Sequence, residues 1–312
     1  MKQICTLGEL LIDMTQNGTD ELGNGRFTAY PGGAPANVAV AAARLGAETA
    51  FIGKVGNDAF GRSLTETLRK EGVDVSGLFR CEDIPTTMAL VSVDERGERE
   101  FAFYRTPGAD TQLTADEAIS ALEELPLILH VGSLSLTTMP AREACEAAVN
   151  YAKERGALIS YDPNYRAALW ESEDLAIEMM KVLIPLADIL KVSDEEMLML
   201  TGTEDFEEGS RILSDQGPSL VLVTLGSQGV FARHGSFAGV VPGFRVKVAD
   251  TNGAGDTFLG AMLAQIAGRE HLLSDLDEEE LRNMVTYANK AASLTCSRRG
   301  AIPAMPFADE LK

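Results

Sequence analysis

Residues 250–263 read DTNGAGDTFLGAML and place two glycines directly ahead of an apolar run of helical character. Glycine costs a helix about 1 kcal/mol relative to alanine, so we interpret Gly253 and Gly255 as the bend at which a helix begins. Glycine also lets backbone amides approach a ligand closely. The unpaired amides and the positive dipole end of a helix N-terminus favour an anion. The stretch therefore predicts a phosphate site.

Asp256 follows the bend directly and gives this prediction a chemical direction. A carboxylate in a first turn stabilises the helix dipole, and this structural role alone would explain it. Beside a bound phosphate, however, a fixed carboxylate can accept the proton of a hydroxyl that attacks the phosphorus. We hypothesise that Asp256 is the base of a phosphotransferase and that the amides of Gly253, Ala254, Gly255 and Asp256 form its anion hole.

Other phosphate-binding motifs are missing from the sequence. No G-x-x-x-x-G-K-[ST] P-loop occurs, and no G-x-G-x-x-G follows the first predicted strand. The stretch GSQG at 226–229 is too short to be informative alone. These absences argue against a P-loop enzyme and against a nicotinamide-dependent dehydrogenase.

Composition limits the partners and the location. Of the 312 residues, 27 are Lys or Arg and 47 are Asp or Glu, so the formal charge is 27 − 47 = −20, which disfavours nucleic acid and anionic membranes as partners. The four cysteines lack CxxC spacing and are expected to be free thiols, and the three histidines lack metal-ligand spacing. The N-terminus has no signal-peptide pattern, and no apolar run is long enough to span a membrane, so we expect a cytoplasmic protein.

Short apolar strands alternate with helical stretches along the chain, as in TAFIGKV, LILHVG, ALISYD, DILKVS and SLVLVTLG. This order predicts an α/β fold with a mostly parallel sheet covered on both faces by helices. Ligands of such sheets bind beyond the carboxyl ends of the strands. Four polar residues are expected at those ends, namely Asp13, Asp162, Ser193 and Thr224.

Two segments interrupt the alternation. Residues 14–31 are turn-rich, and residues 87–105 alternate apolar and polar residues around the turn ERGE, which predicts a hairpin. We interpret both segments together as a small β lid. An ordinary hairpin at the edge of the main sheet is the alternative.

At this point the sequence resembles a known family, the ribokinase-like (PfkB) carbohydrate kinases. DTNGAGDTFLGAM matches the family's C-terminal signature, and PGGAPANVAVAAARLG at 31–46 matches its N-terminal one. GELLIDM, FYRTPGAD, YDPNYRAALW and KVSDEEMLMLTG are most similar to the fructokinases of that family. The resemblance implies one catalytic domain over residues 1–312, built as a three-layer α/β/α sandwich with a β-sheet lid that covers the sugar and often pairs in a homodimer. It also implies ATP, Mg²⁺ and often stimulation by K⁺.

The resemblance also implies the residues that bind the sugar. Glycines permit close approach, and a carboxylate or an amide can bridge neighbouring hydroxyls. An exposed turn is the alternative for Asp13, and an exposed strand end is the alternative for Tyr104 and Arg105. The expected sugar-binding residues are Asp13, Gly32, Gly33, Asn37, Tyr104, Arg105 and Arg166.

On the nucleotide side, the resemblance implies binding of ATP by Lys191, Ser193, Thr224, Gly226, Ser227, Gly229 and Asn289. Packing is the alternative for Asn289. Glu196 would organise Mg²⁺ through water, although Ser193 stands where the family commonly has Asn. Asp250 would be a ligand of K⁺ beside the loop SRRGA, with helix capping as the alternative.

The sequence thus favours ATP-dependent phosphorylation of the 6-hydroxyl of D-fructose. A 2-keto-3-deoxygluconate kinase is the nearest rival, since Arg105 and Arg166 could bind its carboxylate. A ribose or nucleoside kinase is a weaker match. A binding module without chemistry is disfavoured because Asp256, the anion hole and Glu196 occur together.

Overall fold

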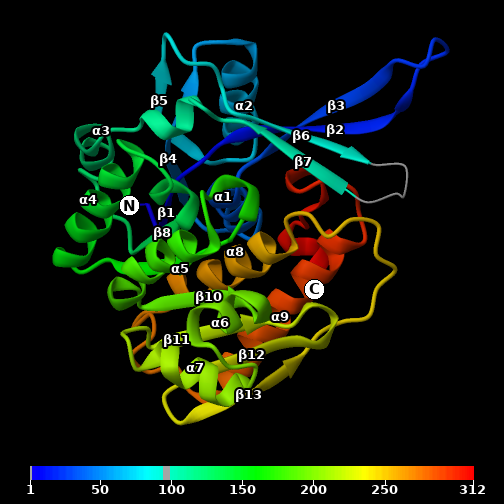
Figure 1. The fold of residues 1–312 in the computed structure, drawn as a ribbon. Coiled ribbons are helices and arrows are strands. Elements are labelled where there is room, and N and C mark those ends of the chain that lie inside the picture. The colour runs from blue at the N-terminus through cyan, green and yellow to red at the C-terminus, as the bar shows by residue number, and fades with distance from the viewer. Residues whose placement is uncertain (1, 94–98) are drawn as a thin grey trace.

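The computed structural model describes residues 2–93 and 99–312, and its central feature is a sheet of nine strands within those ranges (Figure 1). The spatial order is β13-β12-β11-β10-β9-β8-β1-β4-β5. The strands are β1 (Ile4–Leu7), β4 (Thr49–Gly56), β5 (Asp74–Cys81), β8 (Ile128–Gly132), β9 (Leu158–Asp162), β10 (Ile189–Ser193), β11 (Leu220–Thr224), β12 (Gly229–His234) and β13 (Phe237–Pro242).

Pairing in this sheet is parallel from β5 to β11 and antiparallel only where β12 and β13 extend the edge. Successive strand residues point to opposite faces. Thus Cys5 and Leu7 pack into one core and Ile4 into another. A strand that is buried on both faces must be apolar throughout, which explains the short apolar runs in the sequence.

Helices cover both faces, so the predicted three-layer α/β/α architecture is confirmed (Figure 1). One face carries α3 (Ala115–Ser120), α4 (Ala141–Glu154), α5 (Glu173–Val182), α6 (Asp194–Thr201) and α7 (Phe206–Ser214); the other carries α1 (Ala34–Arg44), α2 (Ala59–Lys70), α8 (Ala254–Ala267) and α9 (Glu278–Cys296). Short 3₁₀ turns are η1 (Ala109–Gln112), η2 (Ser133–Leu136), η3 (Ala167–Leu169), η4 (Ile184–Leu186), η5 (Gly226–Gln228), η6 (Ile302–Ala304) and η7 (Ala308–Leu311). All four cysteines are free thiols, as expected. No helix in the described ranges is long and apolar enough to cross a membrane.

A second sheet, which we call the lid sheet, has the strand order β3-β2-β6-β7. Its strands are β2 (Leu11–Thr19), β3 (Gly25–Gly32), β6 (Met88–Val93) and β7 (Arg99–Tyr104). The hairpin of β2 and β3 projects away from the helical layers (Figure 1). The predicted pairing of the segment 87–105 is present as β6–β7, while its turn ERGE lies outside the described residues.

Two details differ from the sequence-based expectation. The segment 14–31 does join the segment 87–105 in one small sheet, as interpreted, but it consists mainly of the strands β2 and β3, which is more strand than its turn-rich sequence indicated. Asp13, expected at the carboxyl end of a main-sheet strand, lies inside β2 and pairs with Tyr30 of β3. The reason is that the chain leaves β1 at Leu7 and enters the lid sheet at Leu11, which puts Asp13 one strand further along. Asp162, Ser193 and Thr224 do end β9, β10 and β11.

Candidate active site

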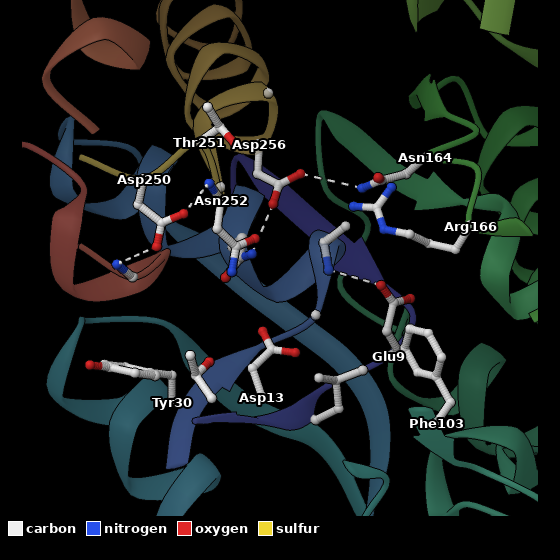
Figure 2. Close-up of a pocket in the computed structure, with 18 of the residues that line it drawn as sticks. Glu9, Asp13, Tyr30, Phe103, Asn164, Arg166, Asp250, Thr251, Asn252 and Asp256 are labelled. Carbon is white, nitrogen blue, oxygen red and sulfur yellow. Dashed lines mark hydrogen bonds between the residues drawn. The ribbon is translucent and has the colours of Figure 1, made fainter. Parts of the chain in front are cut away.

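A cavity of about 1220 Å³ opens where the lid sheet meets the carboxyl ends of the main strands (Figure 2). Its wall combines the segment after β1, the start of α1, the segment after β9 and the N-terminus of α8. Pockets for one small ligand usually measure about 300–1,000 Å³. The cavity is therefore large enough for a small substrate together with part of a second one.

The N-terminus of α8 forms one end of this cavity. Gly253, its N-cap, adopts a left-handed φ of 75°. A side chain there would also collide with Ala301. Gly255 does not adopt a left-handed φ, but a Cβ on it would lie 3.2 Å from Nζ of Lys191. The two glycines thus serve the bend and the close approach of a lysine, respectively.

The predicted anion hole needs one correction. The amide of Ala254 donates a hydrogen bond to the carbonyl of Thr251 (3.3 Å), and Ala254 does not line the cavity. The left-handed turn at Gly253 brings these two groups together. Gly253, Gly255 and Asp256 do line the cavity. The amides of Gly255 and Asp256 belong to the first turn, where intrahelical acceptors are missing.

Asp256 is buried in the first turn of α8, and two amide side chains hold it (Figure 2). Asn37 of α1 donates from Nδ2 to Oδ2 (2.8 Å), and Asn164, after β9, donates from Nδ2 to Oδ1 (3.4 Å). Both oxygens are thus oriented by neutral donors that cannot take or supply the carboxyl proton at neutral pH. The carboxyl group is fixed in position and keeps its ability to accept a proton.

The pKa of Asp256 is raised to about 6, mainly by burial and also by the nearby charge of Asp162, while Asn37, Lys191 and Arg166 limit the rise. At pH 7 the group is mainly ionised. A base with a pKa near the working pH combines the correct ionisation state with useful proton affinity.

Lys191 supplies a buried positive charge beside the same helix end. It extends from β10, lines the cavity and pairs with Oδ2 of Asp162 (2.8 Å). Burial alone would lower the pKa of Lys191, but Asp162 and Glu196 raise it above its ordinary value. Lys191 therefore remains an ammonium group next to Gly255.

Asp13, on β2 of the lid sheet, and Asn37, on α1, also line the cavity. A Cβ at Gly32 would collide with the carboxylate of Asp13, and a Cβ at Gly33 would collide with the carbonyl of Glu9. The glycine pair therefore allows two chain segments to meet at the cavity. Of these two glycines, only Gly33 lines the cavity. Burial raises the pKa of Asp13 to about 6, which Asn252 and Arg166 counteract.

Two buried oxygens in this wall lack a hydrogen-bond partner among the described residues. They are Oδ1 of Asn37 and Oε2 of Glu9. Buried polar atoms of folded proteins are usually paired, so unpaired ones call for a partner such as water or a ligand. Both atoms are acceptors in their present orientation, and they fit a ligand that carries hydroxyl groups.

The lid sheet contributes Phe103 to the cavity wall in place of its expected neighbour, Tyr104. Tyr104 is 60% exposed and does not line the cavity, whereas Phe103 does. Adjacent residues of β7 point to opposite faces, so only one of the pair can face the cavity. Arg105 lines the cavity, but its donors already bind Asp110 (Nε to Oδ2, 2.7 Å), Thr137 (2.7 Å) and the carbonyl of Leu134 (2.9 Å).

The segment after β9 adds Arg166, which was expected, and Asn164, which was not. Arg166 lines the cavity, and its side chain lies beside Asn164 near Asp256 (Figure 2). Asn164 adopts a left-handed φ of 48° and donates its own amide to Asp162 (3.0 Å). The sequence signal for this turn is Asp162-Pro163-Asn164 directly after an apolar strand, a pattern typical of turns.

Of the residues expected to bind ATP, Lys191 is the one that lines the described cavity. Ser193 and Thr224 end their strands at the same edge of the sheet, followed by Gly226 and Ser227 in η5, while Gly229 begins β12. Asn289, on α9, donates to the carbonyls of Val241 (3.2 Å) and Pro242 (3.1 Å), which is the packing role considered as its alternative.

The two residues expected near metal ions are both engaged with backbone amides. Glu196 accepts from Tyr165 (2.7 Å) and from Ser193 (2.7 Å) in a capping box at the start of α6. Asp250 accepts from Asn252 (3.1 Å) and from Gly300 (3.2 Å), so the loop SRRGA does lie beside it. Within the described residues, no group of three His, Cys, Asp or Glu could hold a metal ion.

Comparison with known sequences gives a consistent set of relatives. Residues 1–308 match the family described as pfkB family carbohydrate kinase. Fructokinase-1 of Zea mays is 43% identical over 312 residues, which cover 99% of this chain and 96% of the maize protein.

Solved structures with the same fold include two fructokinases with bound ligands. The ATP-bound fructokinase of Xylella fastidiosa has a TM-score of 0.91 at 34% identity and covers 100% of this chain and 97% of its own. A fructokinase double mutant of Vibrio cholerae O395, with fructose, ADP and a potassium ion bound, has a TM-score of 0.89 at 35% identity and the same coverage.

Proposed function

The chain belongs to the pfkB family of carbohydrate kinases, which confirms the predicted enzyme class, and we propose that it is a fructokinase. It transfers the γ-phosphoryl group of ATP to the 6-hydroxyl of D-fructose and forms fructose 6-phosphate. The fructokinase relatives and the ligands of the two solved structures support this choice of substrates. The observation that carries the proposal is the fixed carboxylate of Asp256 at the helix N-terminus inside the cavity.

Asp256 acts as the general base. The 6-hydroxyl of the sugar approaches its carboxylate and donates its proton as the oxygen attacks phosphorus. Asn37 and Asn164 keep the carboxylate in place during this step. Because Asp256 is buried, little water competes with the sugar hydroxyl for the base.

The N-terminus of α8 and Lys191 stabilise the negative charge of the phosphoryl group. The amides of Gly255 and Asp256 and the positive end of the helix dipole face the transferred group, and the Lys191 ammonium lies beside Gly255. Such fixed donors and charges need little reorganisation during the reaction. Gly253 contributes by making the bend.

The cavity wall suits a polyhydroxy substrate. Asp13 and Oδ1 of Asn37 accept hydrogen bonds from hydroxyl groups, and Arg166 donates to substrate oxygens or to the transferred phosphoryl group. Phe103 covers the sugar from the lid sheet. Arg105, held by Asp110, serves mainly to fix the end of β7.

Nucleotide and metal ions bind mainly through the phosphates. ATP lies along the sheet edge that carries Ser193, Thr224, Gly226 and Ser227. Mg²⁺ commonly keeps several waters and uses few protein ligands, which fits an edge where Glu196 is the nearby acid and is already held by amides. When bound, Mg²⁺ neutralises phosphate charge. K⁺ would be held beside Asp250, whose carboxylate lies against the loop SRRGA.

A substrate panel tests the proposal. With ATP and Mg²⁺, D-fructose should give the highest kcat/KM among D-fructose, 2-keto-3-deoxygluconate, D-ribose and a nucleoside, and phosphorus NMR should locate the phosphate on C6. The carboxylate of 2-keto-3-deoxygluconate needs a cation, and Arg105 is already paired with Asp110 (2.7 Å). A higher kcat/KM for 2-keto-3-deoxygluconate would replace the proposed substrate.

A further inference from the structure

Glu9 lies in the wall of the cavity, yet none of the steps above uses it. It follows β1 in the short connection to β2, and it is 4% exposed. Figure 2 shows its side chain on the wall beside Phe103, whereas Asp256 lies at the end formed by α8. The two acids therefore border different parts of the same cavity.

One carboxyl oxygen of Glu9 has a structural role. Oε1 accepts a hydrogen bond from the amide of Ala34 (2.8 Å), the first residue of α1. The N-cap of this helix is Gly33, which has no side chain that could accept that bond. Glu9 thus caps α1 from another segment, and a single oxygen is sufficient for this purpose.

The other oxygen, Oε2, is buried and has no hydrogen-bond partner in residues 2–93 and 99–312. Arg105 also lines the cavity, but its donors bind Asp110, Thr137 and the carbonyl of Leu134 and leave Oε2 of Glu9 unpaired. The pKa of Glu9 is raised to about 7, mainly by burial, while the backbone amides of Glu9 itself and of Ala34 and the charge of Arg105 limit the rise. An unpaired buried carboxyl oxygen is unfavourable, and a hydroxyl donor from the cavity would relieve that cost.

We propose that Glu9 is a further sugar-binding residue, whose Oε2 accepts a hydrogen bond from a hydroxyl of the sugar other than the phosphorylated one. This inference rests on the proposed function. The two carboxyl oxygens of Glu9 have different roles. Oε1 fixes the start of α1, which carries Asn37, and Oε2 binds the substrate. Glu9 thereby links sugar binding to the position of the helix that orients Asp256.

The variant Glu9→Gln tests the contact. The Ala34 amide keeps the side-chain oxygen on the helix side, so the new NH₂ group replaces the acceptor on the cavity side. Glu9 is ionised at a pH above about 7, and there a hydrogen bond to its charged carboxylate is worth roughly a tenfold to hundredfold change in affinity. We expect KM for fructose to rise by about tenfold or more, with KM for ATP and the melting temperature close to wild type.

Deoxyfructose analogues identify the hydroxyl. In the wild-type enzyme, the analogue that lacks the contacted hydroxyl should lose affinity by a factor similar to that of Glu9→Gln. In the variant, the same analogue should lose little more, because the interaction is already absent. Equal losses for every analogue in both proteins would overturn the inference.

A matched control separates helix capping from sugar binding. Asp277 caps α9 through the amide of Glu280 (2.9 Å) and lies outside the cavity. Asp277→Ala, which removes the capping oxygen, should lower the melting temperature without changing KM for fructose. A Glu9→Gln protein with a lowered melting temperature and a wild-type KM would reduce Glu9 to a capping residue and refute its role in binding.

A crystal structure of the wild-type enzyme with fructose and a non-hydrolysable ATP analogue tests the contact without any substitution. The inference requires a sugar oxygen about 2.5–3.0 Å from Oε2 of Glu9, and an oxygen beyond hydrogen-bond distance refutes it. Failure of the proposed function is distinguishable, since it would appear as missing fructose turnover in the wild-type protein. Failure of the inference would leave fructose turnover by the wild-type protein intact and would appear in the ratio of variant to wild type and in the distance from Glu9 to the sugar.

Discussion

Asp256 lowers the stability of the folded protein at neutral pH as well as serving the proposed reaction. Its pKa rises from the ordinary 3.8 to about 6 on folding because the carboxylate is buried and lies near Asp162. A raised carboxyl pKa means that the folded state binds the proton more tightly than the unfolded state. The contribution of Asp256 to stability therefore falls as pH rises from about 4 to about 6 and stays low above that range. At neutral pH the enzyme retains a charged base at the expense of stability.

The pH dependence of the reaction follows from the same pKa. Asp256 must be ionised to accept a proton, so kcat/KM for fructose should decline as pH falls through about 6. Asp13, whose pKa burial also raises to about 6, loses its charge over the same range and should steepen the decline. Steady-state rates between about pH 4 and pH 8 check this. A flat profile down to about pH 4 would exclude a base with this pKa.

The site residues that could be predicted from the sequence are those whose charged or amide side chains the proposed reaction requires. Asp256, Asp13, Asn37 and Lys191 all line the cavity. Glu9 was missed because a glutamate after an apolar strand gives no sign that it will be buried. Phe103 was missed in favour of Tyr104, because the facing side of a lid strand depends on register, and a shift of one residue reverses it.

At the scale of elements, the main strands and the helices around them were predictable because their patterns are local. Strands buried on both faces are apolar, and α2 ends before Gly72 in a left-handed conformation (φ 82°). The bend before α8 was predictable for the same reason. Glycine at position 253 marks a conformation that side chains rarely adopt.

The strands β2 and β3 were harder to predict. Polar and turn-forming residues at 16–25 dominate the local composition, and the apolar partner of β2 is β6, which lies far away in the sequence. Pairing over such a separation is decided by tertiary structure and leaves little local signal. The hydrogen bonds of Arg105 to Asp110 and Leu134 were unpredictable for the same reason.

At the scale of the whole molecule, the lid sheet leaves apolar side chains exposed. Leu22, in the turn between β2 and β3, is 87% exposed, Phe27 of β3 is 41% exposed and Tyr104 of β7 is 60% exposed. Large exposed apolar side chains on one small sheet favour contact with another protein surface. We propose that two copies of the chain pair through their lid sheets, as expected from the family resemblance.

The expected oligomer is therefore a dimer whose stability depends on the lid. Light scattering coupled to size exclusion should give twice the mass of one chain, and replacing Leu22 and Phe27 by Ser should shift the protein to monomer. Val240, 45% exposed on the edge strand β13, provides the control, since Val240→Ser should leave the dimer intact. A wild-type protein that stays monomeric at high concentration would contradict the proposal.

The central claim is that the Asp256 carboxylate deprotonates the sugar while the N-terminus of α8 holds the transferred phosphoryl group. The most direct measurement compares Asp256→Asn with wild type in two quantities, kcat and the Kd for fructose in the presence of a non-hydrolysable ATP analogue. The account predicts that kcat falls by about 10²–10⁴, that Kd changes little and that the variant melts at a higher temperature at pH 7. A turnover close to that of wild type would contradict it.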